Sequence, residues 1–412
     1  MWTWLLERML SGLVRQGTLI LHMPDGKTLR LGDGGPPKVE VSLTDPALPR
    51  RLVLNPDMAL GEGYMDGTVV IENDDLYGML SLLLANAAFA PRNWREWTMK
   101  LHRLMRWVEQ FNPADRSKRN VAHHYDLSGE LYDLFLDEDR QYSCAYFRQA
   151  DFTLEEAQSA KKHHIAKKLL IEPGMTVLDI GCGWGGLALT LARDYGARVL
   201  GVTLSEEQHK VAVQRARDAG LEDQVEFRLC DYRSVSGQFD RVVSVGMFEH
   251  VGVPQYRTYF RTVHDRLAPE GIALIHTIGR PTPPGATSPW ITKYIFPGGY
   301  CPSLSETMAA MEKEHLYEAD VEIWRLHYAE TLRNWYDRFM ANIDQAKALY
   351  DERFCRMWRY YLIASELTFR HNNQCVFQIQ LAHKQDAVPL TRDYLYADVA
   401  ERSEQAQRRA AE

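Results

Sequence analysis

The stretch at residues 177–186, with the sequence VLDIGCGWGG, constrains the fold more than any other part of this 412-residue chain. An apolar run leads through Asp179 into a turn that contains Gly181 and Gly183, and a helical pattern follows. This order predicts a buried strand, a tight glycine turn and the start of a helix. Such a turn lets the backbone approach a nucleotide-like ligand closely.

The spacing of the glycines distinguishes between the ligands that such a turn binds. Glycines at positions 181, 183 and 185 give G-x-G-x-G, whereas dinucleotide sites have G-x-G-x-x-G. No basic residue follows to hold phosphates, so the turn is not a P-loop. Asp179 supplies a carboxylate for a cationic or amino-bearing ligand. These features favour S-adenosylmethionine over NAD.

Strands alternate with helices from about residue 165, which predicts a parallel sheet covered on both faces. The five expected parallel strands are 176–180, 199–203, 225–230, 241–245 and 272–277. Two later apolar stretches, 321–326 and 375–381, are expected to pair antiparallel at the sheet edge. The predicted fold class is therefore α/β, with the Rossmann-like, seven-stranded sheet of class I S-adenosylmethionine-dependent methyltransferases.

Composition divides the chain into three expected parts. Residues 1–90 form a small N-terminal α+β domain, which includes a leucine-rich helix over 75–88. Residues 91–120 carry eight basic and three acidic side chains with interleaved tryptophans, and are expected to form a basic linker helix. Residues 121–400 form the expected catalytic domain. Its aromatic, proline-rich insertion at 281–312 is too long for a simple connector and is expected to cover an apolar substrate.

Two segments have alternative interpretations that involve a membrane. The first helix places Trp2, Leu5 and Leu6 on one apolar face, which either packs on its own domain or lies in a membrane interface. The basic linker is either a solvated connector or a surface that docks on anionic lipid headgroups. The sequence leaves both alternatives open.

Composition also narrows the class of partner and the compartment. The formal net charge of −7 argues against a nucleic-acid substrate. The six cysteines are scattered without C-x-x-C spacing, so neither a metal site nor a disulfide framework is expected, and a reducing cytoplasm is favoured. The sequence contains no apolar run of transmembrane length and no signal-peptide pattern at its start.

Short segments at the ends of the expected strands mark the edge of the sheet where a ligand pocket should lie. They are Thr203, Leu204 and Gln208 after the second strand, Asp231 and Tyr232 after the third, Glu249 and His250 after the fourth, and His276, Thr277 and Ile278 at the fifth. Thr203 and Gln208 are candidates for a ribose. Asp231 and Tyr232 lie where an adenine would stack.

Glu249 and His276 together are candidates to hold a proton-accepting group beside the methyl donor. Each also has a purely structural interpretation, as a helix cap and as a satisfied core histidine.

Seven ordered motifs give the chain a resemblance to the cyclopropane-fatty-acyl-phospholipid synthase family, which includes the mycolic acid cyclopropane synthases. They lie at 124–128, 142–147, 177–186, 201–208, 246–252, 293–299 and 327–332. The resemblance covers nearly all of 118–385. A weaker similarity in the first domain runs through LGEGYMDG at 60–67.

The resemblance implies a reaction, its substrate and a location. The cis double bond of an unsaturated acyl chain in a membrane phospholipid would attack the sulfonium methyl of S-adenosylmethionine and leave a carbocation. A bound bicarbonate would then remove a proton from the new methyl group, and the ring would close. The family implies a cytoplasmic protein that contacts the inner face of the membrane peripherally. Dimerisation through the first domain is also expected.

The resemblance further assigns site residues. The bicarbonate cage would comprise Cys144, Glu249, His276, Ile278 through its backbone, and Tyr328. The methyl donor would contact Tyr142, Ser143, Gly181, Gly183, Thr203, Gln208 and Tyr232. Ser365 stands where the family commonly has a cysteine once proposed as catalytic, which excludes a thiol nucleophile at that position.

Several functional alternatives remain open at the level of sequence. A related lipid C-methyltransferase would quench the same carbocation differently and give methyl-branched or methylene-bearing chains. A lipid-binding protein with an inactive methyltransferase fold is disfavoured by the intact glycine turn, Glu249, His276 and Tyr328. The aromatic insertion and the acidic net charge also disfavour a small-molecule or RNA methyltransferase.

Overall fold

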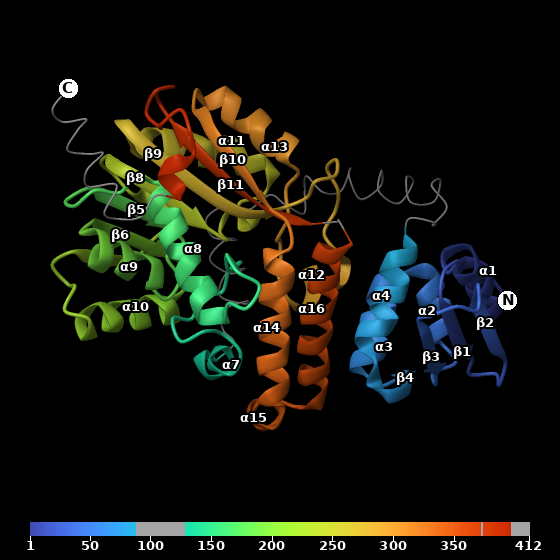
Figure 1. Cartoon of the computed structure of the whole chain (residues 1–412). Helices are drawn as coiled ribbons and strands as arrows, with labels where there is room; N and C mark the ends of the chain where they lie inside the picture. The colour runs from blue at the N-terminus through green and yellow to red at the C-terminus, as the bar shows by residue number, and fades with distance from the viewer. Residues whose placement is uncertain (88–127, 372–373, 397–412) are drawn as a thin grey trace.

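Two sheets organise the part of the chain that the computed structural model describes, which comprises residues 1–87, 128–371 and 374–396 (Figure 1). The larger has seven strands in the order β10-β11-β9-β8-β5-β6-β7, and the smaller has four in the order β2-β1-β3-β4. The linker predicted at 91–120 lies outside the described residues.

The seven-stranded sheet confirms the predicted fold. Its parallel strands are β5 (Thr176–Ile180), β6 (Arg198–Thr203), β7 (Val225–Leu229), β8 (Phe239–Val245) and β9 (Leu267–Gly279). The antiparallel strands are β10 (Tyr317–Trp324) and β11 (Cys375–Ala382). One detail differs from expectation. β11 is paired on both sides, so Cys375 does not belong to an edge strand; β10 forms the edge.

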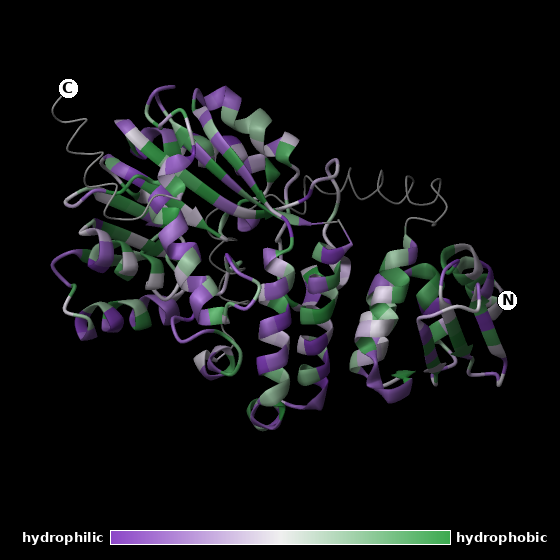
Figure 2. Ribbon diagram, viewed as in Figure 1, coloured by the Kyte–Doolittle hydropathy of each residue, from purple (hydrophilic) through white to green (hydrophobic). Residues whose placement is uncertain are grey.

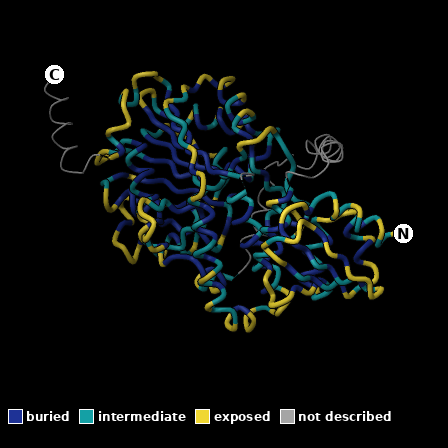
Figure 3. The backbone as a smooth tube through the Cα atoms, turned by 45° about the vertical axis from the view of Figure 1, so that its right-hand side comes forward, coloured by how far each residue is buried: buried dark blue, intermediate teal, exposed yellow. Residues whose placement is uncertain are grey.

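Helices cover both faces of this sheet because alternate strand residues point to opposite sides. Val177 and Val199 face the cluster formed with α8 (Leu154–Lys168), α9 (Gly186–Tyr195) and α10 (Glu206–Asp218). Leu178 and Leu200 face the cluster with α11 (Tyr256–Arg266) and α13 (Leu304–Met311). The strands accordingly appear hydrophobic in Figure 2 and buried in Figure 3.

The N-terminal domain has a core of its own. Its elements are α1 (Trp2–Leu13), β1 (Thr18–His22), β2 (Thr28–Gly32), β3 (Lys38–Leu43), α2 (Leu48–Leu54), α3 (Pro56–Met65), β4 (Val69–Ile71) and α4 (Leu76–Asn86). Leu6 of α1 is fully buried, whereas Trp4 is 56% exposed. The first helix therefore packs on its own domain and leaves part of its aromatic surface in solvent.

A helical hairpin lies between the large sheet and the N-terminal domain (Figure 1). It consists of α14 (His327–Ala341), α15 (Ile343–Leu349) and α16 (Glu352–Arg370). α16 packs against both α3 and α4, and α12 (Pro289–Tyr294) packs against α3. The remaining short helices are α7 (Gly129–Asp133) and 3-10 turns at Glu72–Asp74, Tyr232–Ser234, Phe248–His250, Val253–Gln255, Glu312–Glu314 and Asp393–Leu395.

Among the described residues, none of the helices combines the length and the apolar character needed to cross a bilayer.

Candidate active site

The turn after β5 has the conformation that its glycines predict. Gly181 has φ +83°, and a Cβ built on it would lie 2.9 Å from the Cβ of Met247. Gly185 also has φ +83° and directly precedes α9. A side chain at either position would strain the backbone. At Gly181 it would also press against Met247, which follows β8. The turn therefore holds the backbone open to a ligand.

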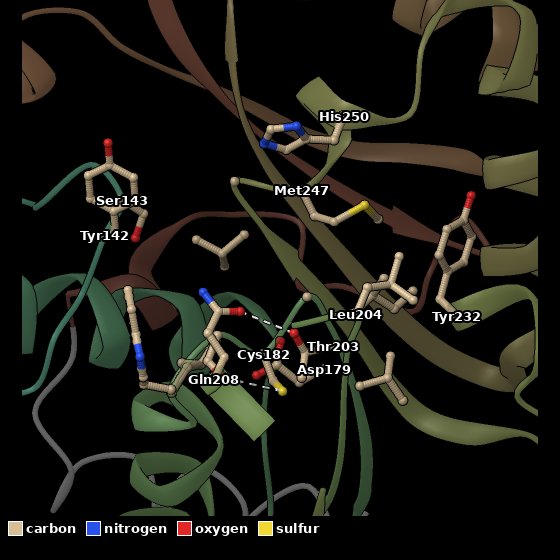
Figure 4. Close-up of a pocket in the computed structure, with 18 of the residues that line it drawn as sticks. Tyr142, Ser143, Asp179, Cys182, Thr203, Leu204, Gln208, Tyr232, Met247 and His250 are labelled. Carbon is tan, nitrogen blue, oxygen red and sulfur yellow. Dashed lines mark hydrogen bonds between the residues drawn. The ribbon is translucent and has the colours of Figure 1, made fainter. Parts of the chain in front are cut away.

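The first cavity, of about 150 Å³, lies at this turn and at the carboxyl ends of the neighbouring strands (Figure 4). All ten residues predicted to contact the methyl donor line it: Tyr142, Ser143, Asp179, Gly181, Gly183, Thr203, Leu204, Gln208, Asp231 and Tyr232. In the view of Figure 4, Asp179, Thr203 and Gln208 group together below Tyr142 and His250. The structure thus places the predicted donor-binding residues in a single pocket.

Asp179 gives this pocket its most distinctive charge property. Its side chain is buried, and its Oδ2 has no hydrogen-bond partner among the described residues. Burial raises the pKa of Asp179 to about 7. A ligand ammonium would satisfy the open oxygen and favour its ionised form, so the donor's amino group fits this position.

The other polar groups of the pocket are held by neighbours. The Thr203 hydroxyl donates to Oε1 of Gln208 at 3.1 Å. Arg233 donates to both carboxylate oxygens of Asp231, at 2.8 and 2.6 Å. Burial opposes the ionisation of Asp231, but these hydrogen bonds outweigh it and lower its pKa. Asp231 is therefore an ionised, fixed carboxylate.

Lys161 of α8 is a buried lysine that the sequence analysis missed. Its Nζ donates to Oε1 of Gln141 at 2.8 Å and to Oγ of Ser143 at 2.7 Å. Gln158, one helical turn earlier, donates to the carbonyl oxygens of the same two residues. Burial lowers the pKa of Lys161 to about 8. A lysine within a run of charged helical residues gives no sequence signal that distinguishes it from a solvent-exposed one.

A second, larger cavity of about 590 Å³ adjoins the first. All five residues of the predicted cage line it: Cys144, Glu249, His276, Ile278 and Tyr328. Tyr142, Ser143, Gly246 and His250 line both cavities. The two cavities therefore share this wall and lie next to each other.

Glu249 lies in the 3-10 turn Phe248–His250 that follows β8, and the neighbouring strand β9 fixes its side chain. Its Oε1 accepts a hydrogen bond of 2.6 Å from the backbone N–H of Ile278, whereas its buried Oε2 has no partner among the described residues. Burial raises the pKa of Glu249 to about 7. The amide of Ile278 is thus engaged by Glu249, whereas the resemblance implied that the Ile278 backbone contacts the base.

His276 and Cys144 of the cage are neutral groups. Nδ1 of His276 lies 3.0 Å from Nε2 of Gln378, and burial lowers the histidine pKa, so the imidazole is uncharged. The Cys144 thiol donates to the carbonyl of Ala145 at 3.4 Å, and burial raises its pKa. Cys144 is therefore a thiol and not a nucleophilic thiolate. His276 is thus also a hydrogen-bonded core histidine, whereas Glu249 caps none of the described helices, because its carboxylate accepts from the backbone N–H of Ile278 in β9.

Aromatic rings surround the cage on the hairpin side. Tyr328 of α14 lies 5.0 Å from the ring of Phe369 and 5.8 Å, edge to face, from that of Trp335. Ser365 of α16 also lines this cavity. Ring faces attract cations, so this wall suits a positively charged reaction intermediate.

Residues from the N-terminal domain complete the second cavity, and the sequence analysis missed them. They are Pro56, Asp57, Leu60, Leu80, Leu83 and Leu84. From the insertion at 281–312, the lining residues run only from Ala286 to Cys301, because 304–311 form α13 and pack against α11. The leucine-rich pattern of 75–88 is the one sequence feature that could have indicated these lining residues. A stripe of leucines alone, however, does not show which surface it packs against.

Comparison with known proteins identifies the family. A family model described as mycolic acid cyclopropane synthetase matches residues 113–379. The chain belongs to the cyclopropane synthase family. It is therefore an S-adenosylmethionine-dependent methyltransferase. A second model, described as a domain of unknown function (DUF7884), matches residues 5–88.

Individual relatives extend this assignment to both domains. The chain is 40% identical over 347 residues to cyclopropane-fatty-acyl-phospholipid synthase of Escherichia coli K12, covering 84% of this chain and 88% of the relative. It is 37% identical over 397 residues to a probable fatty acid methyltransferase of Pseudomonas putida, covering 91% and 97%.

Among solved structures, the chain resembles mycolic acid cyclopropane synthase CmaA1 complexed with SAH and CTAB. The TM-score is 0.62 at 33% identity, over 66% of this chain and 99% of CmaA1. The resemblance to the cyclopropane synthase MmaA2 from Mycobacterium tuberculosis has a TM-score of 0.63 at 32% identity, over 66% and 99%. Both comparisons confirm the predicted methyltransferase fold.

Proposed function

We propose that this enzyme transfers a methylene group from S-adenosylmethionine to the cis double bond of unsaturated acyl chains in membrane phospholipids and so forms a cyclopropane ring. One observation carries the proposal: a large cavity, with a long apolar wall, adjoins the donor pocket at Tyr142, Ser143, Gly246 and His250. An acyl chain in the larger cavity would present its double bond to the donor methyl across this wall.

The reaction balances with the groups that line the cavity. The double bond attacks the sulfonium methyl, the sulfur keeps the bonding electrons, and one chain carbon becomes a cation. The ring of Tyr328 faces that region and stabilises the cation. Loss of a proton from the new methyl group leaves the electron pair that closes the ring. The neutral imidazole of His276 adds no charge that would repel the cation.

The cage residues are compatible with a bicarbonate ion as the base. Glu249 has an open buried oxygen and a pKa near neutrality, so its protonated form can donate a hydrogen bond to an anion. Cys144, His276 and Tyr328 would hold the same ion. When bound, bicarbonate would supply the proton acceptor. To release the Ile278 amide to such an ion, Glu249 would have to give up its 2.6 Å hydrogen bond.

Lipid analysis of a host that expresses the chain tests the proposed function. We expect membrane phospholipids with acyl chains one methylene heavier than those of the empty host, with cyclopropane proton signals in the NMR spectrum. A host whose lipids do not change, although it produces the folded enzyme, would contradict the proposal.

A second candidate function is lipid C-methylation, which gives methyl-branched or methylene-bearing chains. Two relatives favour it: the Pseudomonas putida protein described above, and tuberculostearic acid methyltransferase UfaA1 of Mycobacterium tuberculosis, which is 37% identical over 90% of this chain and 89% of its own length. Both reactions pass through the same cation and differ in how it is quenched. Ring-proton signals in the NMR spectrum identify the cyclopropane product, and methyl-branched or methylene-bearing chains lack them.

We further propose that the enzyme is cytoplasmic, contacts the inner face of the membrane peripherally and forms a homodimer through its first domain. The membrane contact is supported by Trp4, which is 56% exposed, and by the guanidinium of Arg8 at 5.6 Å from its ring. Exposed tryptophan beside arginine suits a lipid headgroup region. Flotation with anionic vesicles, compared between the wild type and Trp4→Ser, tests this contact, and sedimentation tests the dimer.

A further inference from the structure

We propose that the N-terminal domain forms the subsite for the methyl-terminal half of the acyl chain, through Leu80, Leu83 and Leu84 of α4. These side chains would select acyl chains by their length beyond the double bond. The inference rests on the proposed function and gives the N-terminal domain a part in the choice of acyl chain.

Helix α4 has two apolar faces, one in the core of its own domain and one that lines the large cavity. Met79 and Leu82 are buried in the core of the N-terminal domain, and Asn86 accepts hydrogen bonds from the backbone N–H groups of Arg15 and Gln16. Leu80, Leu83 and Leu84 follow the i, i+3, i+4 spacing of a second stripe. That stripe lines the large cavity.

Helix α16 provides the facing wall. Ala364, Ser365, Thr368 and Phe369 lie on successive turns of α16 and line the same cavity, and α16 packs directly against α4. Leu60 of α3 adds a further apolar group from the N-terminal domain. The cavity volume of about 590 Å³ lies within the range of roughly 300–1,000 Å³ that is usual for ligand sites.

Close contacts between α3 and the segment at 288–293 hold the two domains together, so the cavity wall between them has a fixed shape. A Cβ built on Gly61 of α3 would lie 2.4 Å from Nε1 of Trp290, so the two surfaces touch without a side chain between them. Asp57 accepts a hydrogen bond of 2.6 Å from the Ser288 hydroxyl. Glu62 binds Lys293 at 2.6 Å.

A second set of contacts fixes the other end of this interface. Arg359 of α16 pairs with Asp74 at 2.6 Å, and Arg353 pairs with Asp66 at 2.8 Å. The motif at 60–67 thus contributes Gly61, Glu62 and Asp66 to domain docking. Because contacts lie at both ends of α3, the leucines of α4 are held at a fixed distance from the cage.

The polarity of the cavity indicates which part of the lipid meets these leucines. Nearly all polar lining groups come from the catalytic domain, among them Arg280, Thr287 and Gln374, and the Thr368 hydroxyl on α16 is engaged by the Ala364 carbonyl. The N-terminal domain contributes apolar groups, apart from Asp57, whose carboxylate is engaged by Ser288. The ester end of an acyl chain requires polar surroundings, whereas its methyl end requires none. The methyl end therefore fits against α4.

Competition between lipids in mixed vesicles tests the inference. The vesicles contain phospholipids with cis-9-tetradecenoyl, cis-9-hexadecenoyl, cis-9-octadecenoyl and cis-11-octadecenoyl chains. The three cis-9 chains differ only beyond the double bond. The cis-9-hexadecenoyl and cis-11-octadecenoyl chains are identical beyond it and differ on the ester side. Product ratios by mass spectrometry give the ratios of kcat/KM.

We expect Leu83→Trp to lower kcat/KM for the cis-9-octadecenoyl chain, relative to the cis-9-tetradecenoyl chain, by roughly tenfold or more, because the larger side chain fills the far end of the cavity. The same variant should affect the two chains with identical methyl ends equally. Leu54→Trp, at a position 62% exposed on α2, is the matched control and should keep the wild-type ratios. Leu80→Ala should shift preference toward the longer cis-9 chain.

Three results would overturn the inference. One is an equal loss on all four lipids by Leu83→Trp, which would mean that α4 only supports the fold. Another is a change, caused by Leu83→Trp, in the ratio of kcat/KM between the cis-9-hexadecenoyl and cis-11-octadecenoyl chains, which differ only on the ester side. The third is a wild-type enzyme that binds the methyl donor but modifies none of the four lipids, which would overturn the proposed function itself. Donor binding by calorimetry shows that each variant is folded.

Discussion

The carboxylate of Glu249 accepts a 2.6 Å hydrogen bond from the backbone N–H of Ile278, which joins the 3-10 turn after β8 to β9 at the cage. One oxygen is thereby fixed, while the other remains buried without a partner among the described residues. A carboxyl group with a pKa raised to about 7 in this position can exchange a proton near neutral pH.

Replacing Glu249 by glutamine tests whether that proton matters. Glu249→Gln keeps the shape and an oxygen that accepts from Ile278, but it cannot ionise. We expect turnover to fall by roughly 100-fold or more, as for the loss of an acid–base group. Methyl-donor binding, measured by calorimetry, should be unchanged because Glu249 does not line the donor pocket. Wild-type turnover in this variant would remove Glu249 from the mechanism.

The raised pKa of Glu249 also makes folding stability depend on pH. Between its ordinary value of 4.5 and about 7, the folded state holds a proton that the unfolded state releases. Stability should therefore fall as pH rises through this window, by an amount on the order of 3 kcal/mol. Denaturant unfolding at the two ends of this pH window should show a smaller change in the free energy of unfolding for Glu249→Gln than for the wild type. An identical change in both proteins would show that the carboxyl is not buried as described.

Asp179 should link methyl-donor affinity to pH. Burial holds much of this carboxyl in its protonated form below about pH 7, whereas a ligand ammonium favours the ionised form. Affinity should therefore strengthen as pH rises, by up to about tenfold per unit below the pKa. Asp179→Asn should bind the donor more weakly and with little pH dependence over this range. Calorimetric titrations that give the wild type and the variant the same pH profile would exclude the contact.

Gly61→Ala should separate lipid turnover from donor binding. The new Cβ would lie 2.4 Å from Nε1 of Trp290, which lines the large cavity, so the indole must move. We expect kcat/KM for phospholipid to fall by roughly tenfold, while the affinity for the methyl donor is unchanged. Gly12→Ala is the control, since a Cβ there has no neighbour within 4 Å. Full lipid turnover in Gly61→Ala would show that the docking of α3 on Trp290 is dispensable.

The sequence predicted the parts of this protein that depend on local patterns. Strands such as Thr176–Ile180 and the turn at Gly181 follow directly from apolar periodicity and from the need for a positive φ. Residues at the ends of parallel strands converge by topology, which is why Thr203, Asp231 and Glu249 could be placed at one edge. The cage residues Cys144 and Tyr328 came only from the family resemblance.

The sequence did not predict what depends on packing between distant segments. Lys161 has charged neighbours in sequence, yet it is buried because α8 packs over the segment at 141–143. Leu83 belongs to an apolar stripe of α4 that lines the large cavity together with residues of the catalytic domain. The paired position of β11 and the engagement of the Ile278 amide by Glu249 were likewise determined by tertiary contacts.

The most direct test incubates the purified enzyme with phospholipid vesicles that carry a cis-monounsaturated chain and with S-adenosylmethionine labelled with carbon-13 in its methyl group. The account predicts that the label appears in the phospholipid as a ring methylene carbon, at the high-field shift of a cyclopropane, with bicarbonate present. Label in a methyl branch or an exocyclic methylene, or no label in the lipid at all, would contradict it.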